Sequence, residues 1–262
     1  LVVGNNNTNV YVRKPAGTSM TGWPPGTLPG GAVQSSPAAA EMVGASAGLE
    51  LVAVGDGGTI RLYANNGTVL ASRTLSGASG LSSPAVGDLD GAAPLDLAVV
   101  AQNGVNSNLY ALKYDGTTTL AQIWAPKALG DLISTGSPPR GVTPALADMG
   151  GGAALEIIVG DASGQLHIID GATGSETTIC PAFPLLLGTG GALNTSPAVA
   201  DVDNDGFAEA VIASDGGQVF VVNNNAGTNP CAVEWTQTLP GTPIIRSSPA
   251  IADIDTGTLT RE

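Results

Sequence analysis

The sequence predicts an all-β fold made of repeated four-stranded units, and three features carry this prediction. A phrase of Ser or Thr, then Pro-Ala, an apolar stretch and an acidic residue, occurs five times, at intervals of about fifty residues. Repetition at such a period indicates stacked supersecondary units. The chain is rich in turn formers, with 37 Gly and 18 Pro among 262 residues, and only 12% of it is charged. Short apolar runs separated by Asp-Gly turns complete the pattern of strands joined by tight turns. The prolines of the five phrases are Pro37, Pro84, Pro144, Pro197 and Pro249.

The unit that begins at Thr195 shows the expected strand order most clearly. A small apolar first strand, residues 195–202, leads through an acidic turn to Glu209–Ala213, a nearly continuous apolar strand typical of a buried position. An Asp-Gly-Gly hairpin then leads to a third strand, Gln218–Val222. A more polar run, Val233–Leu239, is the expected outer strand. Four strands in about fifty residues correspond to one blade of a β-propeller.

Repetition of this unit predicts a single-domain, five-bladed β-propeller. The chain starts with a second, third and fourth strand but no first, whereas its last phrase provides a first strand and a turn. We therefore expect the last blade to be closed by the N- and C-terminal segments, which removes exposed sheet edges. A window cut from a longer propeller is the alternative. The expected blades are residues 35–82, 83–142, 143–194, 195–246, and 247–262 together with 1–34. Extra sequence around Leu129 to Arg140 predicts a longer loop.

The acidic charge balance excludes several classes of partner. The formal net charge is −13, from 22 acidic and 9 basic residues. Binding to nucleic acid or to an anionic membrane surface needs clustered Lys and Arg, which this chain lacks. No apolar run approaches the roughly 20 residues that span a bilayer, so membrane insertion is not expected. The acidity either serves solubility or binds divalent cations in part.

The two cysteines leave the redox state open. Cys180 and Cys231 are not in a Cys-x-x-Cys pair, and no His cluster lies nearby, so a zinc site is not expected. They either pair in one disulfide, if the protein is secreted, or remain buried thiols.

One acidic loop has the spacing of a metal site. Residues 201–209 have the form D-x-D-x-D-G-x-x-E, in which carboxylates at positions 1, 3 and 5 converge and the Gly allows a sharp bend. An acid at position 9 completes the set, and oxygen-only coordination of this kind suits Ca²⁺. The alternative is an acidic β-turn whose Asp side chains bond to their own backbone. The predicted ligands are Asp201, Asp203, Asp205 and Glu209.

The other copies of this loop have lost ligands, and fewer charged ligands predict lower affinity. The copy at 148–156 keeps only its first and last acids, and the copy that starts at Glu41 keeps almost none. Two copies remain as weaker candidates, and their acids are Asp88, Asp90 and Asp96 in one, and Asp253 and Asp255 in the other.

The repeat with this acidic loop and a following Asp-Gly hairpin resembles the FG-GAP/VCBS repeat of integrin-α-like β-propellers. The resemblance extends over all five copies, although the full metal motif is matched only at Asp201, Asp203, Asp205 and Glu209. It implies a β-propeller with Ca²⁺ in blade loops and an extracellular or cell-surface location. It does not imply one activity, because members serve in adhesion, in carbohydrate binding and as accessory domains of enzymes.

No catalytic residues are predicted. His167 is the only histidine, and it alternates with apolar residues on a third strand, which favours a structural role. A Gly-x-Ser-x-Gly sequence at 44–48 lies in a loop between two strands, not in the strand–helix turn that a nucleophile needs. Trp23, Trp124 and Trp235 fall in equivalent outer strands, where packing between blades is expected and stacking on sugars is the alternative.

These observations predict a calcium-stabilised binding or adhesion module that is not an enzyme. Its ligand would be a protein or a glycan held on a propeller face, with no nucleic acid and no membrane insertion. The alternatives are a lectin-like propeller, a structural subunit of a surface layer or fibre that assembles through the split blade, and the non-catalytic part of a polysaccharide-active enzyme.

Overall fold

The all-β prediction is confirmed. The computed structural model describes residues 1–21, 23, 26–27, 31–44, 48–132, 142–150, 152–177, 183–188, 191–223 and 232–252. These residues form antiparallel strands in five sheets and contain no helix, hence none that could cross a membrane. Both cysteines, as well as Ser46, lie outside the described residues.

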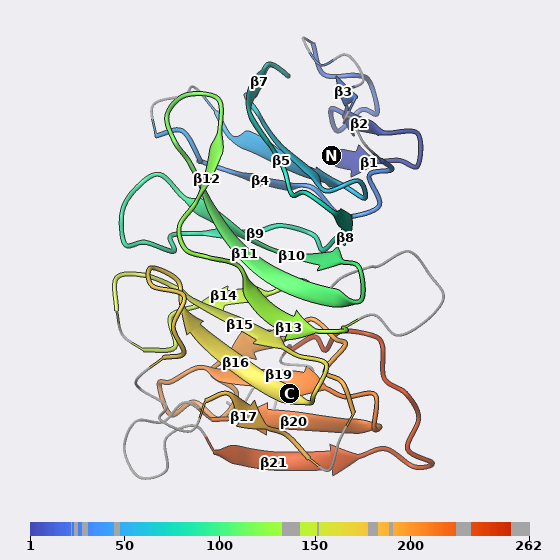
Figure 1. Cartoon of the computed structure of the whole chain (residues 1–262), viewed down its shortest axis with the longest axis vertical. Helices are drawn as coiled ribbons and strands as arrows, with labels where there is room; N and C mark the ends of the chain where they lie inside the picture. The colour runs from blue at the N-terminus through green and yellow to red at the C-terminus, as the bar shows by residue number, and fades with distance from the viewer. Residues whose placement is uncertain are drawn as a thin grey trace.

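The sheets follow one another along the chain (Figure 1). The first consists of β1 (Val2–Gly4), β2 (Asn9–Val12) and β3 (Gly26–Thr27). The second consists of β4 (Ala38–Ala40), β5 (Glu50–Gly55), β6 (Thr59–Tyr63) and β7 (Val69–Thr74). The third consists of β8 (Ala78–Leu81), β9 (Ala85–Gly87), β10 (Asp96–Asn103), β11 (Asn106–Tyr114), β12 (Leu120–Gln122) and β13 (Lys127–Gly130). The fourth consists of β14 (Ala145–Ala147), β15 (Glu156–Gly160), β16 (Gln165–Asp170) and β17 (Leu185–Leu186). The fifth consists of β18 (Ala198–Ala200), β19 (Glu209–Ala213), β20 (Gln218–Val222) and β21 (Val233–Thr238).

The β18–β21 sheet has the order expected of a repeat unit, with each strand paired to the next. The second and third strands match the predicted ranges, and the outer strand ends one residue earlier than predicted. All five residues of β19 are buried, as its continuous apolar pattern predicted, whereas β21 is exposed along its whole length.

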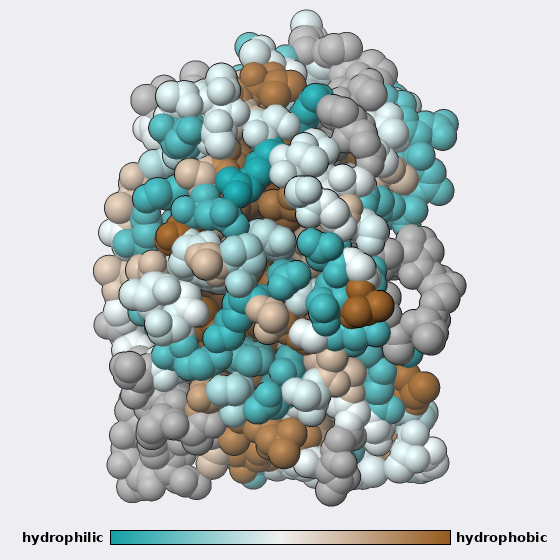
Figure 2. Space-filling model, viewed as in Figure 1, coloured by the Kyte–Doolittle hydropathy of each residue, from teal (hydrophilic) through white to brown (hydrophobic). Residues whose placement is uncertain are grey.

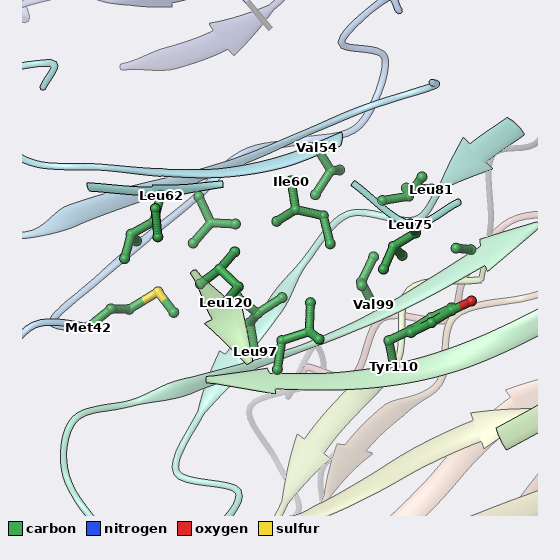
Figure 3. Packing of buried hydrophobic residues seen from close by; sticks show 14 residues of the cluster. Met42, Val54, Ile60, Leu62, Leu75, Leu81, Leu97, Val99, Tyr110 and Leu120 are labelled. Atoms are coloured by element: carbon green, nitrogen blue, oxygen red, sulfur yellow. The ribbon is translucent and has the colours of Figure 1, made fainter. Parts of the chain in front are cut away.

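Hydrophobic clusters hold successive sheets together face to face. The cluster between the second and third sheets contains Ile60 and Leu62 from β6 and Leu97 and Val99 from β10, none more than 1% exposed (Figure 3). Similar clusters join the first sheet to the second, the third to the fourth and the fourth to the fifth. The first strands of the second to fifth units, β4, β9, β14 and β18, contact one another in turn. This arrangement places the acidic loops, which follow these strands, along one edge of the stack.

The first and fifth sheets lie at opposite ends of the long axis (Figure 1). Within the described part of the chain, β1 pairs only with β2, and residues 249–252 form no strand. Residues 253–262, which were expected to complete the first sheet, lie outside the described residues. Closure of the five units into a ring therefore stays a prediction.

The third sheet is more elaborate than the sequence predicted. Both β8 and β9 pair with the same edge of β10, and both β12 and β13 pair with the same edge of β11. The loop expected from Leu129 is thus a strand, β13, as far as Gly130, and residues 133–141 lie outside the described residues.

Two of the three tryptophans join neighbouring sheets, as predicted. Trp23 donates its indole N–H to the carbonyl of Asn65 at 2.6 Å and packs on Tyr63, with ring centroids 5.4 Å apart. Trp124 donates to the carbonyl of Gly171 at 2.9 Å. Trp235, on β21, is instead 47% exposed.

The face in Figure 2 is largely hydrophilic, with a group of hydrophobic atoms at the end where β17, β20 and β21 lie.

Candidate metal centre

The loop at residues 201–208 connects β18 to β19, so it is anchored at both ends by the buried part of its sheet. Asn204 and Gly206 both have positive φ, 61° and 93°, which Asn tolerates and Gly adopts without strain. These two residues let the loop fold back on itself between β18 and β19.

Three of the four predicted ligands come together. Asp201, Asp203 and Glu209 each offer a carboxylate oxygen, and these oxygens lie within 4.8 Å of one another. Asp205 is not in this group; its Oδ1 accepts the backbone N–H of Phe207 at 2.9 Å. The structure thus brings positions 1, 3 and 9 close enough to hold a cation, whereas the carboxylate at position 5 bonds to the backbone of the turn.

Two oxygens of this cluster are buried without a partner. Oδ2 of Asp201 accepts the N–H of Gly206 at 3.1 Å, and Oε2 of Glu209 accepts the N–H of Val202 at 2.8 Å. The other oxygen of each, Asp201 Oδ1 and Glu209 Oε1, is buried and has no hydrogen-bond donor. A buried anionic oxygen without a donor or cation is costly, so these two atoms indicate a ligand that supplies positive charge.

The protonation of Glu209 points the same way. Its side chain is fully buried. Burial raises the pKa of Glu209 to about 7, and the charges of Asp203, Asp205 and Asp201 add to this, although the Val202 N–H bond opposes it. The cluster therefore cannot easily carry all its negative charge unless a cation is bound.

A buried acid at the start of the second strand recurs in all four complete units. Glu50, Asp96, Glu156 and Glu209 are each at most 6% exposed. Each accepts the backbone N–H that follows the first loop acid, from Met42, Leu89, Met149 and Val202 respectively. The sequence prediction missed Glu50 because the loop that starts at Glu41 is one residue longer than the others.

The weaker candidate at residues 88–96 is also assembled. Oxygens of Asp88, Asp90 and Asp96 lie within 4.8 Å of one another. Burial raises the pKa of Asp96 to about 6, with a further contribution from the charge of Asp90. Here Lys113 approaches, with its Nζ 2.9 Å from Asp90 Oδ2. The other weak candidate, Asp253 and Asp255, lies outside the described residues.

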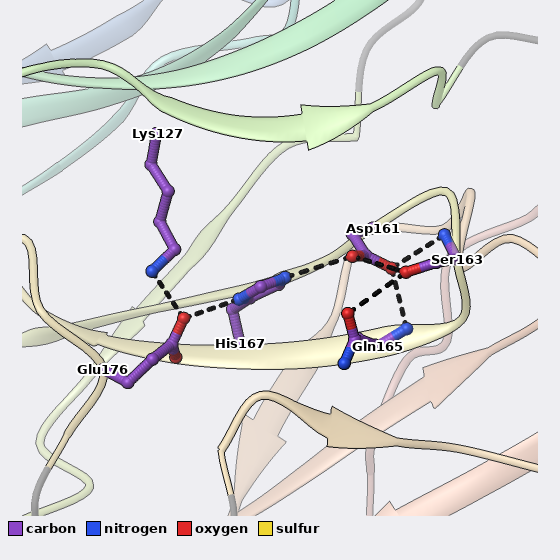
Figure 4. Close-up of polar contacts among 6 residues, drawn as sticks. All are labelled: Lys127, Asp161, Ser163, Gln165, His167 and Glu176. Carbon is purple, nitrogen blue, oxygen red and sulfur yellow. Dashed lines mark hydrogen bonds and ion pairs between the residues drawn. The ribbon is translucent and has the colours of Figure 1, made fainter.

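His167 belongs to a separate polar network between two sheets (Figure 4). Its Nδ1 lies 2.7 Å from Glu176 Oε1 and its Nε2 lies 3.3 Å from Asp161 Oδ2. Lys127 of β13 contacts the same Glu176 oxygen at 2.5 Å, and Ser163 and Gln165 donate to Asp161. A ring between two carboxylates donates from both nitrogens, so His167 is an imidazolium within the fourth unit. The Lys127–Glu176 ion pair links this network to the third sheet.

This network predicts a defined pH dependence of stability. Burial lowers the pKa of His167, but its bonds to Asp161 and Glu176 outweigh this and raise the pKa above its usual value. Burial raises the pKa of each carboxyl, but the bonds from His167 and from other donors together outweigh it and lower both pKa values. The other donors are Gln165 and Ser163 at Asp161, and Lys127 at Glu176. The histidine contribution is complete below about pH 6.5 and is lost as pH rises through the raised pKa. The carboxylate contribution is complete above about pH 4.5 and is lost in acid.

His167→Gln should therefore destabilise the protein most near pH 5–6, by about 3 kcal/mol, because it leaves buried Asp161 without a charged partner and Glu176 with Lys127 alone. Thermal unfolding of both proteins from pH 4.5 to 9 measures this. The difference between them should shrink toward pH 9, and a difference that grows with pH would rule out the charged histidine.

Comparisons with known proteins place the fold. No protein-family model matches the sequence, and no curated protein matches it significantly. Among solved structures, the chain is similar to BamB from Moraxella catarrhalis, with a TM-score of 0.60 and 15% identity over 96% of this chain and 63% of that one. It is also similar to the Dos1 propeller, with a TM-score of 0.56 and 10% identity over 94% and 58%. The fold is propeller-like.

A third similar structure is a rhamnogalacturonan lyase of Bacillus licheniformis, with a TM-score of 0.61 and 13% identity over 97% of this chain and 47% of the lyase. The chain spans less than two thirds of each of these three proteins. At such identities the likeness concerns the fold alone, and these proteins differ in function.

Proposed function

We propose that this chain is a non-catalytic binding module whose propeller scaffold is stabilised by a Ca²⁺ ion in the Asp201 loop. The observation that carries the proposal is the pair of buried oxygens without donors, Asp201 Oδ1 and Glu209 Oε1. Asp203 adds a third carboxylate within reach. A divalent cation would give these oxygens the partner that they lack and would offset the mutual repulsion of the acids.

The donor set favours Ca²⁺ over other metals. The cluster contains carboxylates and no His or Cys, which argues against zinc and other softer transition metals. Loop carbonyls and water can fill further positions, and the flexible geometry of such loops suits Ca²⁺ better than Mg²⁺, which demands a near-ideal octahedron. The resemblance of the repeat to FG-GAP/VCBS propellers supports the same ion and an extracellular or cell-surface location.

Binding without catalysis is supported by the way in which the reactive groups are used. His167 is held between two carboxylates and is only 5% exposed, so it does not reach a substrate. The loop acids have repeated structural roles, since each buried second-strand acid accepts a backbone N–H of its own loop. The ligand in this proposal is a protein or a glycan on a propeller face. Probing the calcium-loaded chain against a glycan array separates the two classes.

Calorimetric titration tests the metal site. Wild type should bind Ca²⁺ with micromolar affinity, in the range of charged-loop sites, and Asp203→Ala should weaken binding at least about tenfold because it removes a carboxylate ligand. Asp148→Ala serves as the matched control, since it removes the first acid of a loop that has lost most of its ligands. An Asp203→Ala protein that titrates like wild type would rule out this site.

A further inference from the structure

The Asp88 and Asp201 loops have the same backbone plan but different partners. In the Asp88 loop, Oδ1 of Asp88 accepts the N–H groups of Gly91 and Ala92 at 2.8 and 3.0 Å, and Oδ2 of Asp96 accepts the N–H of Leu89 at 3.2 Å. The negative charge of Asp90 is balanced by Lys113, whose Nζ donates to Asp90 Oδ2 at 2.9 Å. A protonated lysine amine therefore already lies at this cluster of three acids.

The balance of buried oxygens differs between the two loops. In the described part of the chain, none of the oxygens of Asp88, Asp90 or Asp96 is buried without a partner. In the Asp201 loop, two oxygens are buried without a partner, one from Asp201 and one from Glu209. Among the described residues, no Lys or Arg forms an ion pair with Asp201, Asp203 or Glu209.

The sheet register identifies the position that makes this difference. Leu97 pairs with Leu112 and Ala210 pairs with Val222, so the next pairs along are Asp96 with Lys113 and Glu209 with Asn223. Lys113 and Asn223 thus hold the same place in two repeats, opposite the buried acid of the loop. Asn223 is neutral, and Lys113 carries the charge.

We propose that Lys113 is a built-in cation that takes the place of a metal ion in the Asp88 loop, and that Asn223 is the neutral counterpart which leaves the Asp201 loop open to Ca²⁺. This inference rests on the proposed function for its second half. Between these two loops, the residue opposite the buried acid then decides which one binds metal.

Electrostatics gives the reason for this selectivity. A fixed ammonium beside the carboxylates repels an incoming divalent ion and occupies an oxygen that the ion would need. The Asp88 loop also has Ala92 at the fifth position, where the Asp201 loop has Asp205. Carboxylate oxygens of its three acids still lie within 4.8 Å of one another, so this cluster could hold a cation if Lys113 were removed.

A reciprocal exchange in the full chain tests the inference, with Tb³⁺ luminescence and Ca²⁺ calorimetry as probes. Asn223→Lys should weaken Ca²⁺ binding at the Asp201 loop at least about tenfold, because it adds a like charge within a few ångströms of the ion. Asn223→Met, with a chain of similar length and no charge, should change affinity less than about threefold. Equal affinity in Asn223→Lys and Asn223→Met would overturn the inference.

The converse variants examine the Asp88 loop. Lys113→Met should allow a second, weaker Tb³⁺ to bind, so that the stoichiometry rises from one to two, whereas Lys113→Arg should keep it at one. In chelator, Lys113→Met should also lower the unfolding midpoint by about 2 °C, since the loop acids lose a partly exposed counter-ion. A Lys113→Met protein that matches wild type in both stoichiometry and midpoint would overturn the inference.

The two proposals fail in distinguishable ways. If wild type binds no Ca²⁺ at all, the proposed function fails, while the chelator measurement on Lys113→Met still tests the counter-ion role. Suppose instead that wild type binds Ca²⁺ and loses this binding in Asp203→Ala, while the substitutions of Lys113 and Asn223 change neither affinity nor stoichiometry. In that case only the role proposed for Lys113 and Asn223 fails.

Discussion

Replacing Glu209 with Gln is expected to remove most of the stabilisation that Ca²⁺ gives to the protein. At a Ca²⁺ concentration one hundred times Kd, binding contributes about 2.7 kcal/mol, which for a chain of this size corresponds to about 5–10 °C in Tm. The Gln carbonyl can still accept the Val202 N–H, and its NH₂ group then takes the place of Oε1, which has no donor in wild type. An NH₂ group repels a cation, so the shift in Tm on adding Ca²⁺ should fall below about 2 °C.

The same substitution should have the opposite effect in chelator. Because the pKa of Glu209 is raised to about 7, the folded protein holds a proton that the unfolded chain releases near pH 4.5. Without metal, wild type therefore loses stability as pH rises from about 4.5 through 7, whereas Glu209→Gln, which has no charge to bury, does not. At pH 8 in chelator the variant should be at least as stable as wild type.

Glu156→Gln is the matched control for this prediction. Glu156 is buried at the equivalent position and accepts the N–H of Met149 at 2.7 Å, but its loop keeps only Asp148 of the other acids. Its response to Ca²⁺ should equal that of wild type. A Glu209→Gln protein that gains as much from Ca²⁺ as wild type does would contradict a role for Glu209 as a ligand.

Phe220→Ala is expected to cost about 3–5 kcal/mol of unfolding free energy, the range for removing a buried aromatic ring. The ring is 1% exposed and packs with Ile158, Leu166 and Leu187 in the cluster between the fourth and fifth sheets. Gly188 lies so close that a Cβ built on it would stand 2.9 Å from the ring. Gly188 itself has no side chain that could move into the cavity left by the ring.

Urea unfolding in chelator measures this loss. Phe207→Ala is the control, because Phe207 is 44% exposed and its truncation should cost less than about 1 kcal/mol. Equal losses in the two variants would show that the contact between the fourth and fifth sheets contributes less than its burial indicates.

The repeat in the sequence predicted most of the strands because each strand type has a distinct physical pattern. Glu209–Ala213 and Gln218–Val222 were bounded correctly, since a fully buried strand and its Asp-Gly hairpin leave a clear signal in a single segment. The additional strands β8 and β13 carry no such signal. They pair with the ends of long strands that the other repeats lack, so their position depends on tertiary contacts.

The candidate site was predictable only in part. The spacing of Asp201, Asp203 and Glu209 was enough to group them, because a short loop brings its own residues together. Asp205 lies outside this group because its carboxylate accepts the backbone N–H of Phe207. The spacing of acids in the sequence does not predict which backbone N–H each carboxylate accepts. The Lys113–Asp90 pair spans 23 residues, and the Lys127–Glu176 pair joins two sheets, so both required the folded arrangement of strands.

A crystal structure with Ca²⁺ or Tb³⁺, examined by anomalous scattering, tests the central claim most directly. We expect one peak in the Asp201 loop, about 2.3–2.6 Å from Asp201 Oδ1 and Glu209 Oε1, with Asp203 as a further ligand and no peak in the Asp88 loop. Absence of a peak between Asp201 and Glu209 at saturating metal, with both oxygens still buried and without partners, would contradict the account.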